Sequence, residues 1–140
     1  MKRSYEASIT IAASKQTIFG LLSDAPGHAR WNTTVERIEG TIAEGNDLSV
    51  WANVAPGRAF PAHVAELRPP TRMVWTFRGP LGMFGGTRTF ELTGEDGAVR
   101  FHTREVFDGW LAWLIVRTMP DLQPSFDELA ASLKRAAERG

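Results

Sequence analysis

Apolar and polar residues alternate strictly along three consecutive segments in the second half of the chain. Alternation over such lengths predicts β-strands that bury one face and expose the other. The three segments are residues 72–78, 87–93 and 98–107. Because a shift by one residue would turn every apolar side chain toward solvent, the pattern specifies which residues share a face.

The apolar face predicted for these strands also carries polar residues. If residues 94–97 form the hairpin loop, Phe90 lies opposite Phe101, and Trp75 lies beside Phe90. The residues of this face are then Met73, Trp75, Phe77, Arg88, Phe90, Leu92, Val99, Phe101, Thr103, Glu105 and Phe107. A tightly packed core seldom accepts an arginine, a threonine and a glutamate, whereas the wall of a ligand-binding cavity does.

The rest of the chain supplies four more strand patterns and three helical ones. The strand patterns cover residues 3–11, 35–43, 46–54 and 59–67. After the first of them, Ser14 is suited to cap one short helix, and Asp24 with Pro26 suits the start of a second. An apolar stripe of helical period closes the chain, formed by Leu122, Phe126, Leu129, Ala130, Leu133 and Ala137. We therefore expect one α+β domain over residues 1–140, with seven antiparallel strands curled around a long C-terminal helix.

Composition agrees with a single soluble domain. The chain has 140 residues, of which 43% are hydrophobic and 23% charged, enough for one substantial core. Sixteen basic residues balance sixteen acidic ones, so neither nucleic acid nor an anionic membrane is an expected partner. The absence of cysteine excludes disulfides, a thiolate nucleophile and cysteine-based metal sites. The first residues lack the apolar core of a secretion signal, which favours a cytoplasmic location.

Several segments together resemble one known superfamily. They are Trp31-Asn32, Pro69-Pro70 followed by Trp75, Thr87 to Leu92, His102 to Gly109, and the closing helix with Phe126, Leu129 and Leu133-Lys134. With these segments the chain resembles the START-like, Bet v 1-like (SRPBCC) superfamily, in particular its bacterial polyketide cyclase/dehydrase-like members. The resemblance spans the whole chain and implies a helix-grip fold, with an internal cavity for lipids, sterols, polyketides or other apolar molecules. It brings no catalytic motif, so the catalytic residues stay unknown.

Arg88 and Glu105 are the sharpest candidates for a polar function. In the predicted register Arg88 faces Thr103 and lies diagonal to Glu105, within reach of two long side chains. One hypothesis is that the pair orients a carbonyl, carboxylate or hydroxyl of an apolar ligand. The alternative is an ion pair at the end of the barrel that only neutralises itself.

Aromatic residues are the other candidates for ligand contact, and each of them also suits an ordinary core. They are Trp51, Trp75, Phe77, Phe84, Phe90, Phe101, Phe107 and Phe126. Two further segments, 79–86 and 110–116, are candidates for an apolar lip at the cavity mouth. Their alternatives are a plain hairpin connection for the first and packing against the closing helix for the second. The second segment is far shorter than the roughly 20 residues that span a bilayer, so stable membrane insertion is not expected.

No metal site or cofactor site is predicted. The three histidines, His28, His63 and His102, fall in different elements and are expected at the surface, although a bulge in strand 59–67 would change the direction of His63. None of the usual metal-ligand spacings occurs, and there is no Gly-x-Ser-x-Gly motif for a nucleophilic serine.

The sequence therefore favours binding of a small hydrophobic molecule in an internal cavity. One alternative is a polyketide cyclase, dehydrase or aromatase, in which Arg88 stabilises an enolate and Glu105 moves a proton. A second alternative is a co-chaperone-like interaction domain, which calls for an exposed apolar patch and a core without a cavity. A homodimer is compatible with the sequence.

Overall fold

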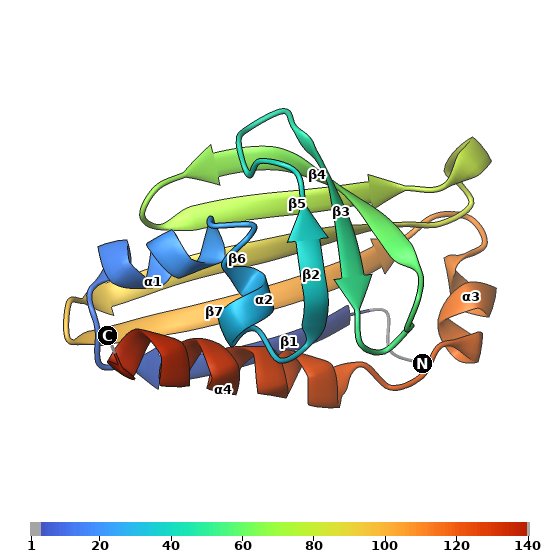
Figure 1. The fold of residues 1–140 in the computed structure, drawn as a ribbon. Helices are drawn as coiled ribbons and strands as arrows, with labels where there is room; N and C mark the ends of the chain where they lie inside the picture. Colours follow the sequence, from blue (N-terminus) through green and yellow to red (C-terminus); the bar gives the residue numbers. More distant parts are fainter. Residues whose placement is uncertain (1–3, 140) are drawn as a thin grey trace.

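The computed structural model describes residues 4–139, which form a curled sheet and its covering helices (Figure 1). The strands are β1 (Ser4–Ile11), β2 (Val35–Glu39), β3 (Asp47–Ala52), β4 (Ala59–Arg68), β5 (Arg72–Arg78), β6 (Gly85–Glu95) and β7 (Ala98–Asp108). The helices are α1 (Lys15–Leu22), α2 (His28–Trp31), α3 (Ala112–Thr118) and α4 (Gln123–Arg139), with a 3₁₀ turn η1 (Pro80–Gly82). The predicted helix-grip architecture is confirmed.

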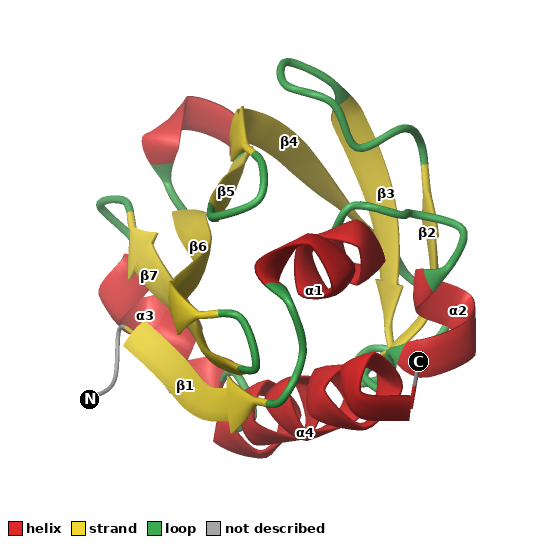
Figure 2. Ribbon diagram, turned by 90° about the vertical axis from the view of Figure 1, so that its left-hand side faces the viewer, coloured by secondary structure: helices red, strands yellow, loops and turns green. Residues whose placement is uncertain are grey.

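All neighbouring strands are antiparallel, in the order β1-β7-β6-β5-β4-β3-β2. Viewed from the end, the sheet curls into an open half-barrel with β1 and β2 on opposite sides, and α4 lies across the opening between them (Figure 2). Helix α4 packs against β1, and α2 packs against β2. The predicted apolar stripe of α4 is buried at Phe126, Leu129, Ala130, Leu133 and Ala137, so the helix closes the barrel with its apolar side inward.

The turn between β6 and β7 is shorter than the sequence analysis predicted. Glu95 pairs with Ala98, which leaves Asp96 and Gly97 as a two-residue turn. Gly97 has a φ of +92°, in the left-handed region that glycine adopts without steric cost. Gly94, which the prediction placed in the loop, lies within β6 opposite Val99. The predicted four-residue loop was therefore wrong.

This shorter turn shifts the predicted register by two residues. Arg88 lies opposite Glu105 rather than opposite Thr103, and Phe90 takes the place opposite Thr103. The β5–β6 pairing is shifted likewise, so that Trp75 lies opposite Arg88. Because side chains alternate with a period of two, a shift by two keeps every residue on the face that the sequence predicted.

Helix α1 occupies one end of the curled sheet. Ser14 caps it as expected, since its hydroxyl accepts a hydrogen bond from the Thr17 backbone N–H at 3.1 Å. Its apolar face buries Ile18, Phe19 and Leu22 in the core. No helix within residues 4–139 is both long enough and apolar enough to cross a membrane.

His28 lies in the core, which corrects the prediction of a surface position. Its side chain is 3% exposed and packs beside Trp31, with 4.8 Å between ring centres. Nε2 donates to the Leu22 carbonyl at 2.9 Å, and Nδ1 accepts from the Asn32 amide at 3.0 Å. These partners suit the neutral ring, because a carbonyl can only accept and the amide nitrogen can only donate. His63 is at the surface and bonded to Asp47.

Burial of His28 generates a prediction about pH. Burial lowers the pKa of His28 below 6.5, because the charged ring would lose its hydration. The neutral ring is therefore favoured in the fold, and the unfolded chain takes up the proton first. We expect the free energy of unfolding to fall as the pH drops below about 6.5, and to fall less steeply in His28→Gln. Urea unfolding across this pH range measures both slopes, with His102→Gln as the control; equal slopes for all three proteins would contradict the prediction.

Candidate functional site

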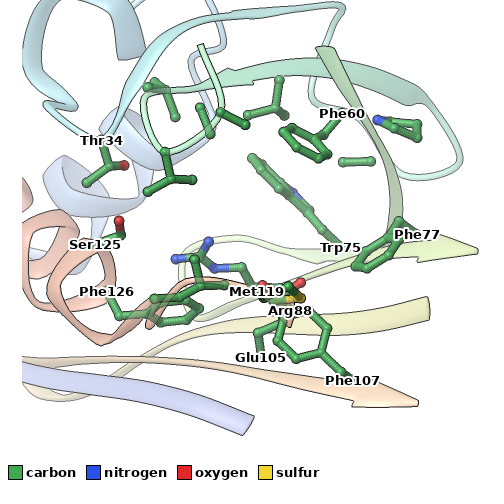
Figure 3. A pocket seen from close by; sticks show the side chains of 18 of the residues that line it. Thr34, Phe60, Trp75, Phe77, Arg88, Glu105, Phe107, Met119, Ser125 and Phe126 are labelled. Carbon is green, nitrogen blue, oxygen red and sulfur yellow. The ribbon is translucent and has the colours of Figure 1, made fainter. Parts of the chain in front are cut away.

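A cavity of about 430 Å³ lies in the end of the curled sheet that α1 does not fill (Figure 3). None of the α1 residues lines it. Its walls come from strands β2 to β7, from α4 and from the segments that precede β2, β4, β6 and α4. Most of the lining side chains are apolar, and the cavity has the size of an ordinary small-molecule site.

The structure brings many of the predicted site residues together around this cavity. Those that line it are Trp75, Phe77, Phe84, Arg88, Glu105, Phe107 and Phe126. They come from four different elements and the segment after η1, and the curl of the sheet brings them together. Their role in binding a ligand stays a prediction.

Four other predicted residues lie elsewhere. Val50 and Ala52 of β3 line the cavity, so the intervening Trp51 points to the other face of the sheet. There the Arg37 guanidinium carbon lies 3.8 Å from the centre of the Trp51 ring. The other three are buried in the core, further along β6 and β7: Phe90, Phe101 and Thr103. Alternation correctly predicted that these three side chains lie on the inner face of the sheet. It does not show along which part of a strand a helix packs against that face.

The cavity also contains residues that the sequence analysis did not single out. Thr34, Phe60, Met119 and Ser125 line it (Figure 3). Phe60 lies two residues before Ala62 in the strand pattern 59–67. Alternation therefore places both side chains on the same face of the strand and could have found Phe60. Thr34 and Met119 lie outside the strands and helices, where no periodicity indicates a direction.

Three phenylalanines form an aromatic wall of the cavity. Phe84 stacks on Phe107 with 5.4 Å between ring centres, and Phe77 meets both rings edge-on at 5.5 and 6.3 Å. Such aromatic contacts stabilise the wall beyond the burial of apolar area. They attach the segment after η1 to the sheet.

The two predicted lip segments lie at this end of the sheet. Leu81 in η1 is 87% exposed and Trp110 is 64% exposed, and the Trp110 Nε1 donates to the Leu81 carbonyl at 3.1 Å. Helix α3, which follows Trp110, packs against β7 at the end of the sheet, away from α4 (Figure 1). Its buried residues Ala112 and Val116 face the protein interior, and Val116 belongs to the same core cluster as Phe126 of α4.

Arg88 reaches into the cavity from β6. Its Nε donates to the Thr103 hydroxyl at 3.3 Å, and this hydroxyl donates in turn to the Thr89 carbonyl at 3.0 Å. The guanidinium carbon lies 4.3 Å from the ring centre of Phe126 and 5.1 Å from that of Phe90. The guanidinium is thus held at its base and packed against two aromatic rings.

Glu105 stands opposite Arg88 on the neighbouring strand, yet the two do not form a direct ion pair. No carboxylate oxygen of Glu105 lies within 4.0 Å of an Arg88 nitrogen. Burial raises the pKa of Glu105, and the positive charge of Arg88 opposes this effect. Burial also lowers the pKa of Arg88, although an arginine keeps its charge in proteins. The predicted self-neutralising ion pair is therefore not formed.

Comparison with known proteins adds one family and several structures. Residues 2–138 match the sequence profile of the family described as polyketide cyclase/dehydrase and lipid transport. No curated protein matches the chain in sequence.

Solved structures match over nearly the whole chain. Zhui aromatase/cyclase from Streptomyces sp. R1128 has a TM-score of 0.76 and 14% identity, with 98% of this chain and 94% of that chain covered. A START superfamily protein from Mycobacterium smegmatis has a TM-score of 0.70 and 16% identity, with 99% of both chains covered. DynU16, from the dynemicin biosynthetic locus, has a TM-score of 0.73 and 15% identity over 99% of this chain, which spans only 48% of DynU16. At these identities the matches show the fold alone.

A glycine in the cavity wall generates a second prediction. A Cβ at Gly86 would overlap the edge of the Phe77 ring and lie 3.1 Å from Oε2 of Glu105. We expect Gly86→Ala to lower the free energy of unfolding by about 1–3 kcal/mol, because Phe77 must move into the cavity. Gly20→Ala is the matched control, since a Cβ at Gly20 meets nothing within 4 Å and alanine favours the helix by up to about 1 kcal/mol. Chemical denaturation of both variants measures the difference; a Gly86→Ala protein as stable as the unmodified one would contradict this packing.

Proposed function

Because the chain belongs to the polyketide cyclase/dehydrase and lipid transport family, we propose that it binds a small hydrophobic molecule in the cavity beside Trp75. The observation that carries this proposal is the cavity itself, with about 430 Å³ and mostly apolar walls. Cavities of this size and character bury most of the surface of a small ligand. The classes that fit are a lipid, a polyketide-like molecule or an aromatic compound.

Apolar burial supplies the affinity in this proposal. Each Å² of apolar ligand surface removed from water contributes roughly 25 cal/mol before the costs of ordering the ligand. The aromatic wall of Phe77, Phe84 and Phe107 is already packed, so little side-chain entropy is lost there on binding. The same wall offers edges and faces to a planar ligand.

An enzyme of the cyclase or dehydrase type is the second candidate, favoured by the position of Glu105 opposite Arg88. A carboxyl group with a raised pKa can transfer a proton, and a guanidinium can stabilise an enolate. These two are the ionisable residues among the described residues that line the cavity. Binding without turnover requires no further group, which is why we rank it first.

The interaction-domain alternative receives less support. It calls for a filled core, whereas the cavity leaves part of the barrel interior open. A cytoplasmic location and a homodimer stay predictions.

Filling the cavity tests the proposed function. We expect the neutral dye N-phenylnaphthylamine to gain fluorescence on binding the unmodified protein. Ala62 lines the cavity from β4, and Ala62→Phe should abolish this gain while the protein still unfolds cooperatively. Ala59→Phe is the matched control, because Ala59 is an exposed residue of the same strand. A dye signal that is absent in the unmodified protein, or equal in both variants, would contradict binding in this cavity.

A further inference from the structure

The cavity holds hydrogen-bond donors that have no protein acceptor. The two terminal nitrogens of Arg88 form no hydrogen bond within residues 4–139, because Nε alone is used, toward Thr103. The Trp75 Nε1 is buried and also lacks a partner. Trp75 and Arg88 are directly paired on β5 and β6, and Figure 3 shows both side chains in the cavity. The buried Trp75 Nε1 costs free energy without a partner, whereas the Arg88 terminal nitrogens are not fully buried and are accessible to a ligand in the cavity.

Acidic groups that could neutralise Arg88 are scarce at the same place. Glu105 is the carboxylate among the described lining residues, and it lies too far from Arg88 for an ion pair. Burial raises its pKa, which favours the protonated and uncharged form. The hydroxyl of Thr34 already donates to Asn32 Oδ1 at 2.6 Å and does not neutralise a cation. The positive charge of Arg88 in the cavity is therefore only partly neutralised by protein groups.

We propose, resting on the proposed function, that the ligand is an amphiphile with a single carboxylate, which the two terminal N–H groups of Arg88 bind. The planar guanidinium presents these donors as a fork that matches the two oxygens of a carboxylate. The apolar body of the ligand lies along Trp75 and the aromatic wall. One guanidinium balances one negative charge, whereas a doubly charged phosphate would leave one negative charge without a partner in the cavity.

Contacts with neighbouring side chains hold the Arg88 guanidinium in place before a ligand binds. Thr103 holds Nε, and the rings of Phe126 and Phe90 pack against the guanidinium at 4.3 and 5.1 Å. A donor pair that is already ordered loses little entropy on binding, which raises affinity and selects geometry. A ligand alcohol or ester would leave the positive charge uncompensated and bind less tightly.

Matched ligand pairs test this inference on the unmodified protein. Decanoate is compared with decanol, and naphthoate with naphthalenemethanol, by displacement of N-phenylnaphthylamine near neutral pH. Within each pair the apolar body is almost the same, so the difference in affinity reports the head group. We expect the carboxylate of each pair to bind at least about tenfold more tightly, as for charge-assisted hydrogen bonds.

Variants assign the preference to Arg88. Arg88→Met has a side chain of similar length and removes the guanidinium. We expect it to remove the preference, so that the carboxylate and the alcohol of each pair bind with similar affinity. Arg104→Met is the control, because Arg104 is exposed on β7 and does not line the cavity, and this variant should keep the preference.

The outcomes separate the two proposals. Equal affinity for acid and alcohol in the unmodified protein overturns the carboxylate inference and leaves hydrophobic binding intact. A preference that persists in Arg88→Met overturns the role of Arg88. Failure of the neutral dye and of both ligand pairs to bind overturns the proposed function together with this inference.

Discussion

The structure depends on a mismatch between a long curled sheet and the short helix inside it. Strands β6 and β7 each have 11 residues, whereas α1 has 8 and covers only part of their concave face. Ile18, Phe19 and Leu22 complete the core where α1 lies. Beyond α1 no helix fills the space between the sheet and α4, and the cavity of about 430 Å³ remains there. The packing that stabilises one end of the barrel thus leaves the cavity at the other.

A charged residue in such a space requires a physical reason. Removing a guanidinium from water is costly, and the usual compensation is an ion pair. Here Arg88 donates one hydrogen bond, to Thr103, and packs against the rings of Phe90 and Phe126, while Glu105 lies beyond ion-pair distance. A buried charge that protein groups neutralise only in part lowers the stability of the fold. The same arrangement suits a binding site, because an anionic ligand can neutralise the rest of the charge. The proposed ligand class follows from this one residue and its surroundings.

The sequence predicted the elements and the faces of the sheet because their periodicity is local. It misjudged the β6–β7 register by two residues, since the choice between a two-residue and a four-residue turn depends on backbone angles at Gly94 and Gly97. It could not separate Phe101 in the core from Phe107 in the cavity, because both share one face and differ only in what covers them. His28 was misplaced because its burial depends on the Leu22 carbonyl of α1 and on the Asn32 amide after α2, which spacing does not reveal.

The central claim is that the cavity is an occupied binding site in the cell. Native mass spectrometry of the freshly purified protein tests it most directly, followed by identification of any molecule that denaturation releases. The account predicts an additional mass that belongs to an amphiphile with an apolar body and one carboxylate. A released molecule without an acidic group would contradict the role assigned to Arg88, and a protein that is empty and also fails to bind a neutral apolar dye would contradict the binding function itself.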